Sequence, residues 1–527
     1  MSDRVGSAGR AAVVQPERLV PLLLAAVALA WVVVSIEPFP VGVFQDDGIY
    51  TELAKSLATG QGYRFLNLPG TPNATHFPPG YPLFLAALWK VFPAFPANVT
   101  LFKFANAALV ALAAALAWRF ARRRVGMSTW TAGLSVGAFT ACAPIVLLGV
   151  MVMSEPLFLA ALFPVLMACE RAAETGRRRD AVVAGAAGGA LALVRTLGIV
   201  AIPATVVALA WRRRWLAALL VCVTGAAVML PWQLWVAAHG ADLPPVLAGK
   251  YGSYWGWLME AVRGGGIPWV AQLVVHNVGQ LTAQGWATVA VDTLPAVVRW
   301  SATIVMAAFF ATGWWRLLHR APVAAWLVAM YMALVISWPF TPARFTWAIW
   351  PLVGIIFGLA IDAVLAWRPV TRPRMGARWA GVAAAALLIA GYGRYNYLGT
   401  TRDWWTHVQS SAATRAKPLA EWIMANTPED AVIATDDDVL IHLYTGRRTI
   451  PNGTFTPQEH LKPQTPAFAT EALRTILRTY DVDYVMASSE YGTYAARGLL
   501  QAQPPELQLV GALKYGVVFR PVPRSDP

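Results

Sequence analysis

Residues 44–82 read FQDDGIYTELAKSLATGQGYRFLNLPGTPNATHFPPGYP and follow the first long apolar run, Leu19–Ile36. Asp46 and Asp47 are adjacent carboxylates just outside an expected membrane helix. Insertion into a bilayer does not require them, and acidic residues that are kept beside a bilayer usually have a function. The alternative is helix capping, because an Asp before a helix accepts hydrogen bonds from its free N–H groups. One Asp suffices for capping, and a second one beside the hydrocarbon is an added cost, so both interpretations stay open.

The composition predicts a protein that crosses a membrane several times. Of the 527 residues, 57% are hydrophobic and only 13% are charged, and the 24 Trp residues suit aromatic belts at the two interfaces. Residues 1–398 carry 30 Lys and Arg against 14 Asp and Glu, whereas residues 399–527 carry 12 against 14. The positive charge therefore belongs to the membrane part and indicates topology, with no nucleic-acid partner. The three Cys residues show no disulfide or metal spacing.

About eleven apolar segments are expected to span the bilayer. They lie near residues 19–36, 99–120, 128–150, 154–170, 181–194, 197–211, 215–236, 296–316, 321–338, 345–366 and 379–398. The segments 181–194 and 197–211 are short and could form one span. Arg177–Arg179 precede this pair and Arg212–Arg214 follow it. Both clusters can be cytoplasmic only if the chain crosses twice between them.

The distribution of arginine predicts which segments lie outside. With a cytoplasmic N-terminus, the short loops that carry basic clusters all face the cytoplasm. The long segments 37–98 and 237–295 then lie outside, as does everything after residue 398. We therefore expect a multi-pass protein of the cytoplasmic (inner) membrane. Residues 1–398 would form the transmembrane domain, and residues 399–527 an extracytoplasmic domain.

The outer segments are expected to contain interfacial helices. Residues 47–59 repeat apolar side chains at a spacing of four, and Gly60 is placed to end that helix. Residues 81–92 are apolar but too short to cross, so we expect them to lie on the outer membrane surface. The segment 237–295 is expected to hold further interfacial helices.

The C-terminal part predicts a small α/β domain, because helix and strand signals alternate there. We expect helices at 417–426 and 470–479, and strands at 431–435, 483–487 and 515–520. Asp436–Asp438 follow the first of these strands. They could bind a divalent cation, although a solvated turn is the more ordinary interpretation of such a run.

Charged residues at the outer ends of three spans are expected to converge on the face that carries the two Asp residues. They are Glu155, Arg195 and Arg344. Glu155 before Pro156 could be only a helix start, and an arginine without a function would be expected to snorkel to water. Random snorkelling would, however, scatter such residues over both faces. An outward cavity with acids for proton transfer and arginines for an anionic group fits better.

Two further candidates for phosphate contact lie in the first outer segment. They are His76, which could donate to a phosphate, and Lys90. An exposed loop histidine is the alternative for His76. The sequence shows no phosphate-binding Gly loop, zinc spacing or Ser/Cys nucleophile elbow, so no metal ligand is assigned.

These motifs together resemble the GT-C glycosyltransferases, in the branch that contains protein O-mannosyltransferases and lipid A aminoarabinose transferases. The likeness rests on Asp46-Asp47-x-x-Tyr50, Gly60-x-Gly62-Tyr63, Pro78-Pro79-Gly80-Tyr81-Pro82, Ser154-Glu155-Pro156, Val194-Arg195-Thr196 and Arg344-Phe345 before Pro351. It covers nearly the whole chain and includes an outer C-terminal domain.

The resemblance implies inverting transfer of a sugar from a polyprenyl-phosphate donor to an envelope lipid, glycan or protein outside the cytoplasmic membrane, with membrane lipids around the protein. Asp46 matches the family's catalytic base, beside Asp47, and Tyr50 and Tyr81 are expected to bind substrate. Relatives often carry a Lys just before the paired prolines, where this chain has Phe77. This departure argues against the aminoarabinose and lipid A pair. Phosphate contacts would instead come from His76, Lys90, Arg195 or Arg344.

A transporter or flippase for a lipid-linked or anionic solute is the rival hypothesis. Such a protein should show repeated halves, with charged or broken helices near the bilayer midplane. The sequence shows no such halves, and its charges lie near one face. The glycosyltransferase is therefore the leading hypothesis.

Overall fold

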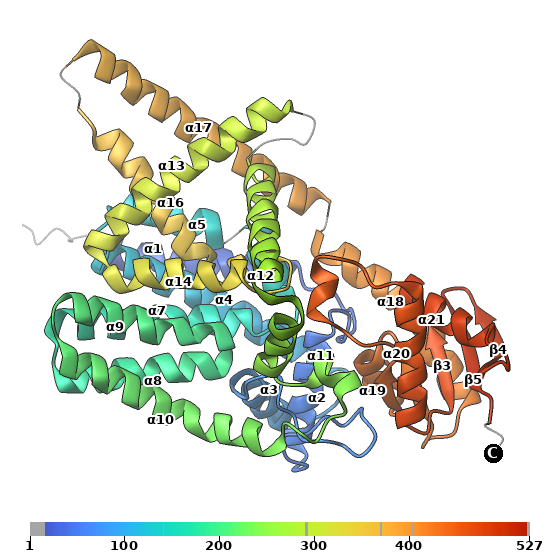
Figure 1. Ribbon diagram of the computed structural model, residues 1–527. Coiled ribbons are helices and arrows are strands. Elements are labelled where there is room, and N and C mark those ends of the chain that lie inside the picture. The colour runs from blue at the N-terminus through green and yellow to red at the C-terminus, as the bar shows by residue number, and fades with distance from the viewer. Residues whose placement is uncertain (1–15, 141, 290–293, 369–370, 403, 524–527) are drawn as a thin grey trace, which may run out of the picture.

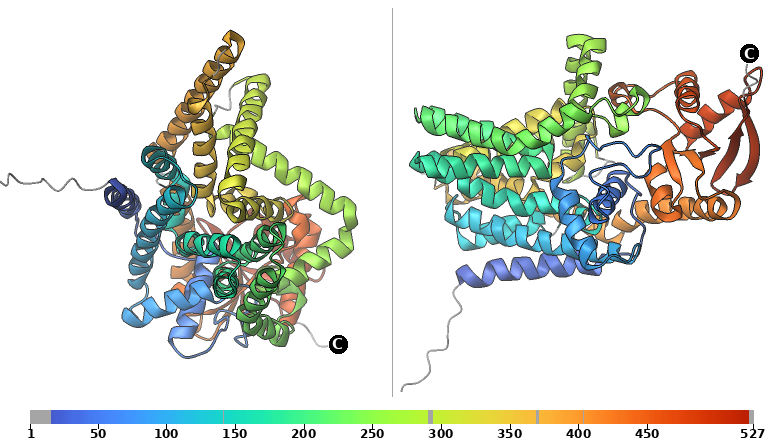
Figure 2. Two further views of the ribbon diagram at one scale, coloured as in Figure 1. Left: turned by 90° about the vertical axis from the view of Figure 1, so that its left-hand side faces the viewer. Right: turned by 90° about the horizontal axis from the view of Figure 1, so that it is seen from below.

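The chain folds into a bundle of helices with a smaller sheet domain at one end (Figure 1). This arrangement is that of a computed structural model, which describes residues 16–140, 142–289, 294–368, 371–402 and 404–523. Figure 2 shows the bundle helices side by side, with the sheet domain beyond one of their ends. The expected fold class, a helical membrane protein with a C-terminal α/β domain, is confirmed.

Six helices in the described part of the chain are long and apolar enough to cross a membrane alone. They are α1 (Pro16–Val34), α4 (Asn98–Arg123), α7 (Glu155–Thr175), α10 (Trp215–His239), α13 (Ala296–Arg320) and α17 (Arg372–Thr401). A seventh span is available if α5 (Thr129–Thr140) and α6 (Ala143–Val150), which are bent by 55°, cross as one unit.

The remaining expected spans form shorter helices. They are α8 (Arg178–Val194), η1 (Thr196–Val200) with α9 (Ala201–Trp211), α14 (Pro322–Ile336) and α16 (Trp350–Ala366). Proline explains part of the shortening, because Pro322 and Pro351 stand in the first turns of α14 and α16, where helices begin. Every expected segment is thus helical, but the count of about eleven exceeds the six or seven that length and composition support in the described residues.

Basic clusters that are far apart in sequence meet at one end of the bundle. Arg124, after α4, pairs with Glu170 of α7 at 3.2 Å. Arg320, at the end of α13, donates to the carbonyl of Val125 at 3.3 Å. The loops that follow α4 and α13 therefore share one end, as the distribution of arginine predicted. That this end is cytoplasmic stays a prediction.

An outer layer covers the opposite end of the bundle. It contains α2 (Asp46–Ala58), α3 (Gly80–Val91), η2 (Pro245–Leu247), α11 (Ala248–Tyr251), α12 (Tyr254–Ala287) and α15 (Pro342–Trp347). Helices are present at the expected segments 47–59 and 81–92, as α2 and α3. Their place at the membrane surface stays a prediction. The 34-residue α12 runs across the direction of α7, α8 and α9, and it breaks at Gly266, where φ is +61° (Figure 1).

The C-terminal domain is a mixed sheet between two helical layers. Its strands are β1 (Val432–Thr435), β2 (Arg448–Pro451), β3 (Tyr484–Ala487), β4 (Leu507–Leu513) and β5 (Gly516–Pro521), in the order β2-β1-β3-β5-β4. β1 is parallel to β2 and β3, whereas β5 is antiparallel to β3 and β4. The helices are α18 (Trp404–Asn426), α19 (Asp438–Thr445), α20 (Pro466–Thr479) and α21 (Glu490–Leu500), with η3 (Pro457–His460) before α20.

Alternate residues of β1, which lies between β2 and β3, face the two helical layers. Ile433 packs in the same buried cluster as Leu419 of α18, whereas its neighbour Ala434 packs with Leu473 of α20. This period of two is expected of a strand that is buried on both faces. The sheet therefore has its own core, as the sequence predicted for a domain of this size.

The C-terminal domain packs directly against the outer layer. Leu53 of α2 and Val439 of α19 belong to one buried apolar cluster. Gly42 permits the approach, because its φ is +95° and a Cβ atom there would lie 2.7 Å from Cβ of Leu440. The sheet domain thus packs against the loop that leads to Asp46.

Gly42→Ala should loosen this contact. The new side chain must adopt a left-handed backbone conformation, which costs about 1–2 kcal/mol. It also overpacks against Leu440, at about 1–3 kcal/mol. Thermal unfolding should show a loss of about 2–5 kcal/mol, with faster protease cleavage between the domains.

Gly60→Ala is the matched control, since Gly60 has φ of +77° and nothing lies within 4 Å of an added Cβ atom. This variant should lose the free energy that a left-handed backbone costs an alanine, but it makes no steric clash with a neighbouring residue. Equal losses in the two variants would contradict a role for the contact with Leu440.

Candidate active site

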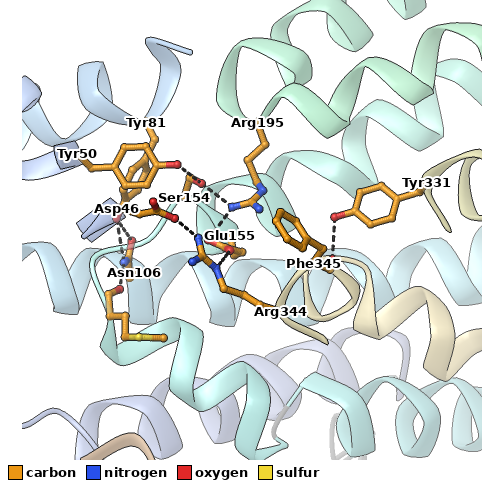
Figure 3. Close-up of polar contacts among 11 residues, drawn as sticks. Asp46, Tyr50, Tyr81, Asn106, Ser154, Glu155, Arg195, Tyr331, Arg344 and Phe345 are labelled. Carbon is orange, nitrogen blue, oxygen red and sulfur yellow. Dashed lines mark hydrogen bonds and ion pairs between the residues drawn. The ribbon is translucent and has the colours of Figure 1, made fainter. Parts of the chain in front are cut away.

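Four charged side chains form a connected cluster at the end of the bundle that is covered by α2, α3 and α15 (Figure 3). Nη2 of Arg344 lies 2.5 Å from Oδ2 of Asp46, and its Nε donates to Oε1 of Glu155 at 3.0 Å. Nη1 of Arg195 lies 2.8 Å from Oε2 of Glu155. The structure thus brings together four residues that the sequence placed on one face. Glu155 bridges two arginines, and Arg344 bridges two acids.

The cluster has a buried half and an exposed half. The side chain of Glu155 is 0% exposed and that of Arg195 is 8% exposed, whereas those of Asp46 and Arg344 are 29% and 30% exposed. Buried charges are tolerated only when they are paired and hydrogen-bonded. Arg195 meets this condition through Glu155 and through Oγ of Ser154 at 2.8 Å. The other half, Asp46 and Arg344, is partly open to solvent.

The start of α7 positions Glu155. The hydroxyl of Tyr50 lies 3.1 Å from Oγ of Ser154, which connects α2 to α7. Nδ2 of Asn106 donates to the carbonyl of Met151 at 2.7 Å and fixes the loop before α7 (Figure 3). Sequence reasoning missed Asn106, because it is a single polar residue inside an apolar segment.

Close backbone packing positions Arg195. This residue follows α8, where the chain turns into η1. Gly80, at the start of α3, lies against that turn, and a Cβ atom on Gly80 would come within 2.6 Å of the carbonyl oxygen of Leu193. The glycine in the Pro-Pro-Gly-Tyr-Pro motif is therefore needed for α3 to lie beside Arg195.

The short helix α15 positions Arg344. The hydroxyl of Tyr331, on α14, donates to the carbonyl of Phe345 at 2.8 Å (Figure 3). Tyr331 is fully buried, so this bond ties the backbone beside Arg344 to the bundle. Tyr331 gave no signal in the sequence, because an aromatic residue in an apolar span is ordinarily core.

Asp47 makes its hydrogen bonds to the loop before α2 rather than to the charged cluster. Oδ2 accepts from the N–H of Gly42 at 2.8 Å, and Oδ1 accepts from the N–H of Phe44 at 2.9 Å. Burial raises the pKa of Asp47 to about 6, while these bonds act in the opposite direction. Between the loop and Asp46 stands Gln45, with φ of +63°. These are the contacts of a residue that shapes a turn.

Two tyrosines expected to bind substrate lie next to the cluster. The ring of Tyr50 meets Tyr81 edge-on at 5.0 Å and Phe77 at 4.9 Å. The hydroxyl of Tyr81 is hydrogen-bonded to Asn106. Phe77, which stands where relatives often carry a Lys, is therefore part of a buried aromatic cluster.

The two remaining candidates are not cations of the cluster. His76 is buried, its Nδ1 bonds to the carbonyl of Gly252, and its ring centroid lies 3.8 Å from that of Tyr254. Burial lowers the pKa of His76 to about 4, so the ring is neutral at pH 7 with Nε2 as an acceptor. Lys90 is exposed in the last turn of α3. The hydrogen bonds of the described residues do not join Lys90 to the cluster.

Asp436–Asp438 stand at the carboxyl end of β1, beside the loop 42–45. Together these segments line a cavity of about 280 Å³. Asp436 accepts from the N–H groups of Ser488 at 2.7 Å and Ser489 at 3.1 Å. No three His, Cys, Asp or Glu side chains of the described chain converge as a metal ion requires.

A second buried network joins α2, α11 and the C-terminal domain. Oε1 of Glu52 accepts from the N–H of Asn67 at 2.5 Å, and Nδ2 of Asn67 donates to the hydroxyl of Tyr251 at 2.8 Å. The Tyr251 hydroxyl donates to Oδ2 of Asp438 at 2.5 Å. Burial raises the pKa of Glu52 to about 8, so this acid is largely uncharged at pH 7. The network ties the helix that begins at Asp46 to the sheet domain.

No protein-family model matches the chain, and no curated protein matches its sequence. The solved structures that match include two of ArnT from Cupriavidus metallidurans. The structure bound to undecaprenyl phosphate has a TM-score of 0.55 at 17% identity, over 94% of this chain and 97% of that chain. The apo structure gives 0.54 with the same identity and coverage. This chain has the fold of ArnT. The resemblance to GT-C glycosyltransferases, first seen in short motifs, is confirmed at the level of the fold.

Glu52→Gln should remove a pH dependence of stability. The folded-state pKa of about 8 lies above the ordinary value of 4.5, so the folded chain binds this proton more tightly than the unfolded chain does. The free energy of unfolding should therefore fall as pH rises from about 4.5 to 8, by roughly 1.4 kcal/mol per pH unit. Gln keeps the acceptor for Asn67 and does not ionise.

The advantage of the Glu52→Gln variant over the wild type in thermal unfolding should be about 2 kcal/mol larger at pH 8 than at pH 6. Glu429→Gln, which changes an exposed acid before β1, is the control. An advantage that does not grow with pH would show that Glu52 is not the titrating group.

Proposed function

We propose that this protein is a membrane-bound inverting glycosyltransferase. It moves a sugar from a polyprenyl-phosphate donor to a lipid, glycan or protein of the cell envelope, on the outer face of the cytoplasmic membrane. The supporting observation is the cluster of Asp46, Glu155, Arg195 and Arg344 at one mouth of a bundle with the ArnT fold. The ArnT structure with undecaprenyl phosphate supports a lipid phosphate as the ligand class.

Asp46 is the general base of this proposal. An acceptor hydroxyl has too high a pKa to attack unaided, so a carboxylate within hydrogen-bond reach takes its proton as the new bond to the anomeric carbon forms. Asp46 suits this role because it is the exposed acid of the cluster, whereas Glu155 is enclosed. Attack from the side opposite the phosphate inverts the anomeric carbon, and the bonding electrons leave with the phosphate oxygen.

The arginines serve the leaving phosphate. A guanidinium group stabilises the negative charge that develops on a phosphate, and it does so strongly where water is excluded. Arg344 is the exposed guanidinium of the cluster, and Arg195 lies behind it. Tyr50 and Tyr81 are buried next to the cluster and support it from behind, since the Tyr50 hydroxyl contacts Ser154, which in turn bonds to Arg195. Asp47 shapes the turn before Asp46 and takes no part in the chemistry.

Asp46→Asn should abolish transfer while the fold is retained. Loss of a general base lowers a rate by about 10²–10⁴-fold. Membranes that contain the full chain would be supplied with radiolabelled polyprenyl-phosphate sugars, and label in the acceptor fraction would be measured. Asp242→Asn is the control, because Asp242 is an acid of the outer segment that bonds to Asn73 at 3.0 Å. Undiminished transfer by the Asp46→Asn protein would remove Asp46 as the base.

The same assay separates the enzyme from a flippase. A flippase moves the lipid-linked sugar without breaking its bond to phosphate, so the label stays with the polyprenyl lipid. A midplane site with broken helices is expected of a transporter. The cluster instead lies where α7 begins and α8 ends, at one end of the bundle, and this favours transfer.

A further inference from the structure

The exposed arginine of the proposed site is already occupied by the proposed base. Nη2 of Arg344 lies 2.5 Å from Oδ2 of Asp46, and Nε of Arg344 is bonded to Glu155. While this pair persists, Nη2 of Arg344 and Oδ2 of Asp46 occupy each other, so neither atom is open to a phosphate oxygen or to an acceptor hydroxyl. The arrangement therefore describes a resting state rather than a reacting one.

The cluster also has no spare positive charge for a phosphate. Its two arginines are matched by two acids. A phosphate that binds Arg344 must take the place of a carboxylate. Glu155 is not the one replaced, because it is 0% exposed and contacts both arginines. Asp46 is 29% exposed and contacts one arginine, so it is the carboxylate that can leave.

We propose that the phosphate of the polyprenyl-phosphate donor displaces Asp46 from Arg344, so that the base is released only when the donor is in place. This inference rests on the proposed function and adds a control step to the same site. Within the described residues, Nη1 of Arg344 has no hydrogen-bond partner, so a phosphate oxygen can contact it before Asp46 leaves. Glu155 and the Tyr331 bond to the α15 backbone keep Arg344 in position during the exchange.

The exchange keeps the charges balanced through the reaction. The donor phosphodiester carries one negative charge and replaces that of Asp46 on Arg344. As the acceptor oxygen bonds to the anomeric carbon, its proton passes to Asp46 and the bond between that carbon and the phosphate oxygen breaks. The phosphate gains a second negative charge while Asp46 becomes neutral and does not compete for Arg344. Loss of the Asp46 proton to water then restores the competing carboxylate and favours release of the lipid phosphate.

A double-mutant cycle on lipid binding tests the exchange. The probe is undecaprenyl phosphate, and its equilibrium affinity for the full chain would be measured in detergent micelles. Asp46→Asn should tighten binding about fivefold or more, although it abolishes transfer, because no carboxylate then competes for Arg344. In the Arg344→Gln protein the same substitution should change affinity by less than about twofold.

Through-space repulsion is the main alternative, since any acid near a bound phosphate weakens its binding. Asp242→Asn is the control, because the Asp242 carboxylate bonds to Asn73 and takes no part in the cluster or in the turn before Asp46. It should leave the affinity unchanged. If the control variant gained as much affinity for undecaprenyl phosphate as Asp46→Asn, the proposed exchange would be overturned. This comparison does not use the Arg344→Gln protein, so it remains valid if that protein fails to fold.

Two further outcomes decide the matter. An Asp46→Asn protein that binds the lipid no more tightly than the wild type would show that the pair does not compete with phosphate. In that case the wild type still binds the lipid, and the proposed function survives. Failure of the wild type and all variants to bind any polyprenyl phosphate would instead overturn the donor class itself, and the inference with it.

Discussion

Glu155 is the residue on which the geometry of the charged cluster depends. Its carboxylate is fully enclosed and lies 2.8 Å from Arg195 and 3.0 Å from Arg344. Breaking a buried ion pair by removing one partner costs about 3–5 kcal/mol, because the other charge is left without compensation. The two arginines can therefore share this space only with a carboxylate between them. They come from the end of α8 and from α15, and Glu155 begins α7, so one side chain fixes how three parts of the bundle meet.

The position of Asp46 depends on contacts from the other side. Asp47 closes the loop from Gly42 to Phe44, and Leu440 of the sheet domain presses on Gly42. Two turns further along α2, Glu52 is joined through a buried network to the same domain. The helix that begins with Asp46 is thus held both at its start and in its middle. The C-terminal domain supports the site, although it contributes no side chain to the charged cluster.

Local patterns predicted much of this arrangement, and contacts across the fold decided the rest. Apolar runs and their terminal charges predicted every bundle helix and the four residues of the cluster, because both signals are local. Asp46 and Asp47 are chemically identical in the sequence, and the turn at Gln45 determines which of them meets Arg344. Tyr331 and Asn106 are buried polar groups within apolar runs, so their roles depend on partners that the sequence does not reveal.

Elements with weak patterns were missed for a similar reason. β2 has four residues, with an arginine at one end and a proline at the other. Its composition does not favour a strand, and its pairing with β1 stabilises the extended conformation. α12 is interrupted by glycine and proline, and its apolar residues follow no single face, so its sequence predicted only interfacial pieces. In both cases packing against neighbouring elements overrides weak intrinsic propensity.

The neutral charge of the resting cluster suits a site that opens beside a membrane. A free guanidinium would attract the phosphate of any anionic lipid, since such lipids concentrate near basic groups at the membrane surface. Pairing Arg344 with Asp46 weakens binding of every phosphate by the same factor, so it does not select the donor by itself. Selection must then come from the part of the donor that other lipids lack, which is the sugar.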